Sequence, residues 1–205
     1  MKDSKKAAIL IGILGVIFYS SKAIFVKLAY QHGIDTISLM FLRMGFALPI
    51  YISIAYFKRT KINSFVKPNI KEWIFIILMG FIGYYLSSWF DFEGLKYIDA
   101  SLERIILFIY PTIVVILSKI FLKTKITKNQ VLAISVCYSG LIIIFYRKLF
   151  LDFEQSENLI RGSFLVFLCA ISYAVYFTGS GKLLPKLGTL SFTTKVMIIA
   201  SLVVF

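Results

Sequence analysis

Long runs of apolar residues, separated by short polar segments, constrain the fold of this chain more than any other feature. A helix rises 1.5 Å per residue, so about 20 apolar residues cross about 30 Å of hydrocarbon. In hydrocarbon every backbone N–H and C=O must be bonded internally, and uninterrupted runs lack the alternation of barrel strands. The sequence therefore predicts an all-α integral membrane protein, a multi-span helical bundle. The seven runs cover, approximately, residues 7–30, 36–57, 72–91, 101–122, 129–146, 162–181 and 189–205.

The composition supports a membrane protein and argues against a nucleic-acid-binding one. Of the 205 residues, 59% are hydrophobic and only 16% are charged, whereas a soluble domain has about a quarter of its residues charged. The formal net charge of +13 would suggest a nucleic-acid partner in a soluble protein. Here the basic residues gather in the short loops, where they hold loops in the cytoplasm. We expect the lipid bilayer, and no nucleic acid, as the partner of this surface.

The basic residues also predict an orientation. Thirteen of them lie at the N-terminus or in loops on one side, and four lie on the other side. This asymmetry places the N-terminus in the cytoplasm, and we expect the membrane to be the cytoplasmic membrane of a bacterium. The thirteen are Lys2, Lys5, Lys6, Lys58, Arg59, Lys61, Lys67, Lys71, Lys123, Lys125, Lys128, Lys182 and Lys186, and the four are Lys96, Arg147, Lys148 and Arg161.

An internal repeat relates the beginning of the chain to its end. Residues from 162 onward echo the first two apolar runs at offsets of 155 and 153, which predicts a repeat over 1–147 and a partial second copy over 161–205. A unit of five spans is odd-numbered, so a second copy enters the membrane inverted, as in many secondary transporters. The matched residues are Lys27, Leu28, Gly33, Thr36, Ser38, Met44 and Ala47 with Lys182, Leu183, Gly188, Thr189, Ser191, Met197 and Ala200.

The run FEGLKYIDASLERIILFIYPTIVVILSKIFL, with FLRMGFALPI in the second apolar run, resembles the EamA-type members of the drug/metabolite transporter superfamily. The resemblance covers essentially the whole chain. It implies ten spans in two inverted five-span repeats, transport of small metabolites and no cofactor. The chain departs from the family pattern after the fourth span, where many members carry Gly-Glu and this sequence has Lys123 and Thr124.

By the family's standard the chain holds one complete repeat and the start of a second. The seventh run stops at Phe205 without a polar flank, so we expect a fragment or a truncated reading frame. Such a chain would be inactive alone, or would work with a second copy of itself or with a separate C-terminal half.

Charged residues inside apolar runs are the first candidates for a functional site, because each costs about 2.5–3.5 kcal/mol on insertion scales. Lys22, Arg43, Glu103 and Arg104 come from three runs and fall at similar depth in the outer half of the membrane. Being adjacent on a helix, Glu103 and Arg104 are expected not to face each other. We predict that Lys22, Arg43 and Glu103 line an outward-facing polar cavity, which Arg104 joins unless it snorkels outward.

Three bases against one acid would favour a substrate carrying a carboxylate or phosphate, and Glu103 could serve as a proton-coupling group. A purely structural ion pair is the alternative. Hydroxyl-bearing residues are further candidates for substrate binding, although such groups often only join helices. Pro111 should bend the fourth span, with a hinge role as a further hypothesis. The hydroxyl candidates are Ser21, Tyr84, Ser88, Tyr110 and Tyr176.

The function that these patterns favour is a secondary transporter of a small metabolite, amino-acid-like or another small organic solute, working by alternating access. The chain carries a single histidine, two isolated cysteines and no metal-ligand or nucleotide-binding motif, so we expect no enzyme, no metal and no cofactor. The alternatives are a non-transporting fragment or subunit of a larger membrane assembly and, less favoured, a membrane-embedded lipid-modifying enzyme. Such an enzyme would need paired acids or a His/Asp set, and Glu103 alone does not suffice.

Overall fold

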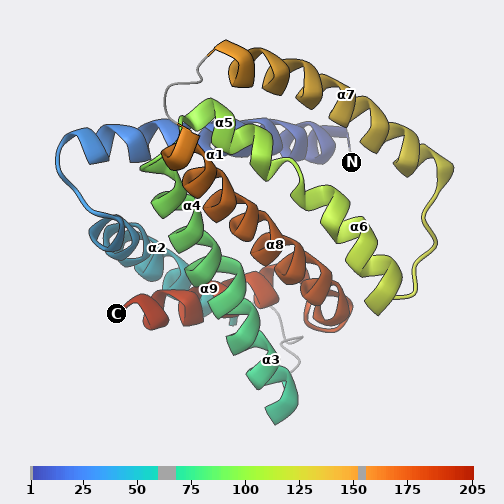
Figure 1. The fold of residues 1–205 in the computed structure, drawn as a ribbon. Coiled ribbons are helices and arrows are strands. Elements are labelled where there is room, and N and C mark those ends of the chain that lie inside the picture. The colour runs from blue at the N-terminus through green and yellow to red at the C-terminus, as the bar shows by residue number, and fades with distance from the viewer. Residues whose placement is uncertain (1, 60–67, 152–155) are drawn as a thin grey trace.

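A computed structural model describes residues 2–59, 68–151 and 156–205, and the described residues form helices joined by short loops (Figure 1). Lys61 and Lys67, two of the predicted cytoplasmic residues, lie outside the described part. The helices are α1 (Lys2–Gln31), α2 (Thr36–Arg59), α3 (Ile70–Gly80), the π-helical η1 (Phe81–Leu86), α4 (Ser87–Leu95), α5 (Ala100–Leu107), α6 (Tyr110–Phe121), α7 (Lys128–Leu151), α8 (Ser156–Leu187) and α9 (Thr189–Val204).

The helices confirm the predicted all-α membrane fold. Five helical segments among the described residues are long and apolar enough to cross a membrane, and Lys128–Ile143 and Thr189–Val204 are shorter apolar helices. The five segments are Ile9–Gln31, Thr36–Phe57, Ile70–Leu95, Ala100–Phe121 and Glu157–Leu187. The third predicted run ended too early at residue 91, because α3, η1 and α4 continue one another to Leu95.

Helix α8 occupies the middle of the fold and contacts α4, η1, α5, α6 and α9 (Figure 1). Glycines make the closest of these contacts possible. A Cβ on Gly94 of α4 would stand 2.7 Å from the Val166 side chain, and one on Gly162 of α8 would stand 3.0 Å from the Gly94 carbonyl oxygen. Because neither position has room for a side chain, α4 and α8 approach with their backbones almost in contact.

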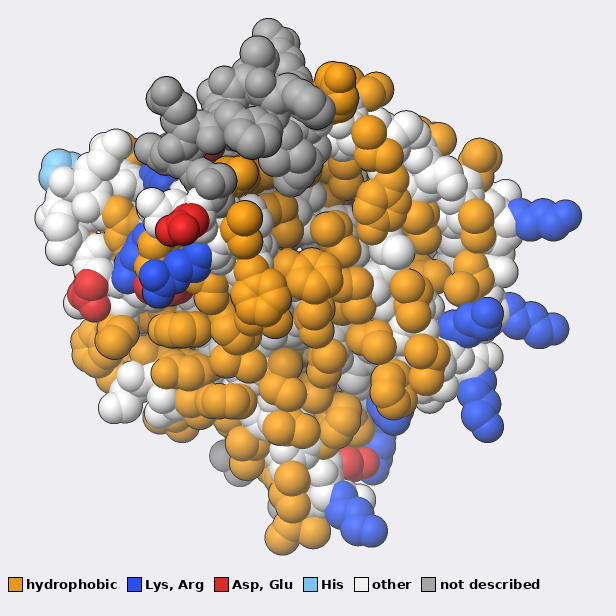
Figure 2. Space-filling view, viewed as in Figure 1, with side chains coloured by type: hydrophobic (Ala, Val, Ile, Leu, Met, Phe, Trp, Pro, Cys, Tyr) orange, Lys and Arg blue, Asp and Glu red, His pale blue; other side chains and the backbone are white. Residues whose placement is uncertain are grey.

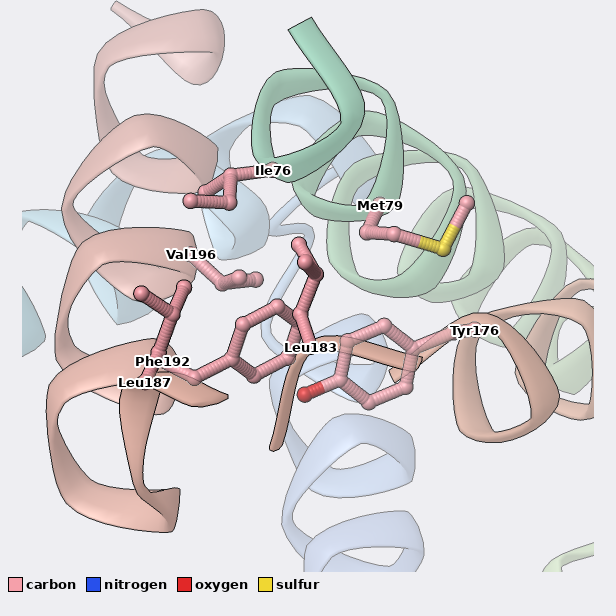
Figure 3. Packing of buried hydrophobic residues seen from close by; sticks show 7 residues of the cluster. All are labelled: Ile76, Met79, Tyr176, Leu183, Leu187, Phe192 and Val196. Atoms are coloured by element: carbon pink, nitrogen blue, oxygen red, sulfur yellow. The ribbon is translucent and has the colours of Figure 1, made fainter. Parts of the chain in front are cut away.

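A cluster of buried apolar side chains joins α3, α8 and α9 (Figure 3). Within it the rings of Tyr176 and Phe192 stack at a centroid distance of 6.4 Å. On the α3–η1 side, Gly80 and Gly83 allow α9 and α8 to come close. The members of the cluster are Ile76, Met79, Tyr176, Leu183, Leu187, Phe192 and Val196.

The outer surface is predominantly apolar. Figure 2 shows hydrophobic side chains over the middle of one face, with Lys and Arg side chains towards its margins. Residues 9–20 of α1 are all exposed, and most described side chains of α7 are exposed as well. In a membrane these faces can contact lipid or other helices without the cost of meeting water.

The fourth span is interrupted near its middle. Helix α5 ends at Leu107 and α6 begins at Tyr110, with Pro111 in the first turn of α6. Proline has no N–H and is tolerated in a first helical turn, where that N–H has no helical partner. Pro111, where the sequence predicted a bend, thus lies next to the point at which the span divides into two helices.

Candidate functional site

Buried charged side chains from three spans meet in one cluster. Lys22 of α1 donates a hydrogen bond to Asp91 of α4, and its Nζ lies 3.9 Å from Oε1 of Glu103 of α5. The side chains of Asp91 and Glu103 are fully buried, while that of Lys22 is 16% exposed. Lys22 and Glu103, two of the predicted site residues, thus lie close together. We call Lys22, Asp91, Glu103 and Arg104 the ion cluster.

Arg104 is part of the cluster, and its side chain does not extend away towards the membrane surface. Its Nε lies 3.2 Å from Oε2 of Glu103, and it also donates a hydrogen bond of 2.8 Å to the carbonyl oxygen of Tyr19. Its guanidinium lies 4.7 Å from the centre of the Tyr19 ring. The expectation that Glu103 and Arg104 cannot face each other was wrong. The arginine side chain is long enough to fold back along its own helix while its far end reaches α1.

Asp91 is the member of the cluster that sequence reasoning missed. The third predicted run ended at residue 91, so this acid stood at the edge of the run and was not among the charged candidates. In the structure it is completely buried in α4, one turn beyond Ser88. The interpretation of one acid facing three bases must therefore be corrected to two acids facing Lys22, Arg43 and Arg104. The local positive excess is smaller by one charge.

Arg43 of α2 lies beside the cluster and reaches α4 by a different route. It donates a hydrogen bond of 2.9 Å to Oγ of Ser88, and its guanidinium lies 5.6 Å from the centre of the Phe92 ring. Among the described residues it forms no ion pair with a carboxylate within 4.0 Å. The structure thus brings Lys22, Glu103 and Arg104 together. Arg43 lies beside them, bonded to Ser88, which precedes Asp91 by one turn of α4.

Several polar atoms of the cluster are buried and lack a hydrogen bond to any described residue. They are Oδ1 of Asp91, both carboxylate oxygens of Glu103 and Nε of Arg104. Buried polar groups in proteins are normally bonded, and each exception calls for an explanation such as a function or an additional ligand. The ion pairs hold these groups at distances of 3.2–3.9 Å, so their hydrogen-bonding capacity is not used by any described residue.

Aromatic side chains form a second group beside α8. The hydroxyls of Tyr84 and Tyr176 lie 3.3 Å apart, and their rings meet edge to face at 5.1 Å. Tyr110 stacks on Phe177 at 5.5 Å and approaches Tyr173 at 6.3 Å. Tyr84, Tyr110 and Tyr176 therefore gather around α8, next to the π-helical turn of the third span and the break of the fourth.

The remaining predicted residues have local roles in this structure. Ser21 donates a hydrogen bond of 2.9 Å to the carbonyl of Ile17 within α1, which is the bond that a helix-facing serine makes. Lys195 of α9, which lies within one residue of the position that the repeat offset of 153 gives for Arg43, donates one of 2.6 Å to Ser191 in the same helix. Among the described residues, no three His, Cys, Asp or Glu side chains are placed to hold a metal ion.

Membrane-spanning helices around a buried ion cluster define the class as a multi-pass helical membrane protein. The EamA-like transporter family model matches residues 6–146, more than half of the chain. The chain therefore belongs to the EamA-like transporter family, within the drug/metabolite transporter superfamily.

Several curated proteins that are named as transporters are similar to this chain. The uncharacterized transporter YcbK of Bacillus subtilis (strain 168) is 28% identical over 180 residues, which cover 86% of this chain and 55% of the relative. The uncharacterized transporter YyaM of the same organism is 28% identical over 160 residues, or 78% of this chain and 51% of the relative. An uncharacterized transporter of Archaeoglobus fulgidus is 28% identical over 127 residues, or 62% and 43%. The chain spans about half the length of these relatives, and no solved structure matches it.

Proposed function

We propose that the chain acts as a secondary transporter that moves a small organic solute across the cytoplasmic membrane of a bacterium by alternating access. The observation that carries the proposal is the ion cluster, because buried charges in a membrane are costly and mark substrate or ion pathways. Its members come from α1, α4 and α5, so any movement of one of these helices changes the pairing of the others.

Alternating access also needs places where spans can bend, and two spans offer them. The third contains the π-helical turn η1, and the fourth is divided between Leu107 and Tyr110. π-Helical turns are frequent at functional sites, and a break at proline frees backbone groups locally. We assign Pro111 to the hinge of the fourth span, with α6 as the part that moves.

The internal repeat supports a transport unit that is built from two related halves. Gly33 and Gly188, which the repeat pairs, have φ angles of 76° and 75° in the links before α2 and α9. Left-handed backbone of this kind favours glycine, so the paired positions share a structural requirement. Inverted-repeat transporters bind substrate between their halves. A substrate site between two such halves is therefore part of the proposal.

The charges and rings suggest the class of solute. Lys22, Arg43 and Arg104 outnumber Asp91 and Glu103 by one, which favours an anionic group on the substrate. Tyr84, Tyr110 and Tyr176 lie against α8 and offer hydroxyl and ring contacts for the rest of the molecule. An amino-acid-like solute with a carboxylate matches this combination.

Transport by everted membrane vesicles from cells expressing the chain tests the proposal. The vesicles are supplied with a panel of labelled amino acids and small organic acids, and with ionophores that collapse the membrane potential and the pH gradient. We expect one class of solute to move in vesicles carrying the chain, and not in vesicles carrying the Arg43→Gln variant. Transport driven by ATP after both gradients are collapsed would contradict a secondary mechanism, and no flux of any solute would contradict transport by this chain.

A further inference from the structure

Resting on the transport function proposed above, we propose that Asp91 and Glu103 share one proton and form the proton-binding site of the transport cycle. Neither residue binds the proton alone, because the site consists of two carboxyl groups from neighbouring spans. The coupling ion is then a proton, and the acid pair is where it is carried.

The position of the two buried acids favours a proton shared between them. The Lys22 ammonium contacts both carboxyl groups, by a hydrogen bond to Asp91 and at 3.9 Å from Oε1 of Glu103, so the two acids lie close together, and both side chains are fully buried. An ionised carboxylate can only accept hydrogen bonds. Two ionised groups therefore repel each other across this contact, whereas one shared proton turns the repulsion into a hydrogen bond, as in other paired carboxylates.

The partners of each acid show where the proton lies. Asp91 accepts a hydrogen bond from the Lys22 ammonium, so it is stabilised as the anion. Glu103 has Lys22 and Arg104 nearby, at 3.9 and 3.2 Å, but neither of its oxygens accepts a hydrogen bond from a described residue. Glu103 therefore holds the proton and donates it towards Asp91.

Groups on four elements surround the pair and set when it releases the proton. Lys22 and Tyr19 face it from α1, Arg104 from α5 beside Glu103 itself, and Cys169 and Tyr173 from α8, with Arg43 approaching from α2. On release, the O–H bond of Glu103 breaks, its electron pair stays on the carboxylate and the proton passes to water. Lys22 and Arg104 then balance the second negative charge.

Infrared spectroscopy of the purified full-length chain in detergent tests the proposal without any substrate. A protonated carboxyl gives a C=O stretch that shifts in D₂O and is absent from carboxylates. We expect this band at neutral pH in the unaltered chain and its loss in both Asp91→Asn and Glu103→Gln. Glu93→Gln is the matched control, because Glu93 lies in the same helix but pairs with Lys96 at 2.7 Å and accepts a bond from Thr36. Its band should be unchanged.

The two single variants distinguish a shared proton from simple burial. If the band survives in Asp91→Asn, Glu103 is protonated by burial alone and the shared site is wrong. A missing band in the unaltered chain at neutral pH also overturns it. Should either variant fail to fold, the pH titration of the unaltered chain decides, and it must show release of one proton as the band disappears.

The transport proposal and the proton site can fail separately. If the band behaves as expected but the chain moves no solute, the shared proton is supported and the transport function is contradicted. If solute flux is insensitive to a pH gradient and the band is absent, the proton site is contradicted and the transport function is retained.

Discussion

At the scale of single residues, Lys22 is the cation on which the ion cluster depends. It is the only member that contacts both buried carboxylates, by a hydrogen bond to Asp91 and at 3.9 Å from Glu103. Removing one partner of a buried ion pair leaves an uncompensated charge and costs about 3–5 kcal/mol. We expect Lys22→Met to lower the free energy of unfolding by that amount, measured by denaturation in detergent.

A second ion pair provides the matched control for this measurement. Lys186 contacts Glu72 at 2.5 Å, but its side chain is 48% exposed. Exposed pairs contribute little to stability, so Lys186→Met should leave the unfolding midpoint nearly unchanged. Equal losses in the two variants would show that burial does not make the Lys22 pairing special.

The sequence brought Lys22 and Glu103 into one group of candidates, whereas it left Asp91 out at the edge of a predicted run. Lys22 and Glu103 were placed together because rise per residue and orientation give depth directly. Asp91 was missed because polar residues follow it, and hydropathy falls there although the helix continues to Leu95. The burial of this acid depends on helices distant in sequence that pack on α4, among them α1 and α8, and a local hydropathy pattern contains no information about them.

At the scale of elements, the end of α6 contains a strained residue. Lys123 follows the helix with a φ of 53°, a left-handed conformation that costs a non-glycine residue about 1–2 kcal/mol. We expect Lys123→Gly to raise the free energy of unfolding by about 1 kcal/mol, measured by thermal denaturation in detergent.

Lys125→Gly is the control for that gain. It also removes a lysine from the same loop, but Lys125 has no positive φ, so the added backbone freedom should give no stabilisation. A gain in both variants would mean that loss of positive charge, and not relief of strain, is responsible. The sequence indicated the departure at Lys123 but not the conformation, since φ depends on how the helix end is capped.

Of the two interruptions within the spans, one could be predicted from the sequence and the other could not. The interruption near Pro111 was predictable, because proline cannot donate to the helical ladder. The π-helical turn at Phe81–Leu86 was not. A Cβ on Gly83 would stand 2.4 Å from the Tyr176 ring, and this contact joins residues 93 positions apart. The register of the turn is thus tied to packing against α8, which no local pattern records.

At the scale of the whole molecule, the length of the apolar runs and the composition predicted the class of protein, and motifs across the first repeat predicted the family. The sequence did not predict which partner covers the apolar faces of α1 and α7. These faces carry exposed side chains such as Phe18 and Ile143, and lipid and a second half of a transporter are equally apolar. Hydrophobicity therefore predicts that they are buried in the membrane without identifying the partner.

The distribution of basic residues predicts how the whole bundle is oriented in the membrane. Thirteen basic residues against four place the N-terminus and the loops around Lys61 and Lys125 in the cytoplasm. Reporter fusions test this directly. A phosphatase that is active only outside the cytoplasm should be inactive at both positions and active at Lys96, in the loop between α4 and α5. Activity at Lys61 or Lys125 would reverse the topology, and the ion cluster would then lie nearer the cytoplasmic side.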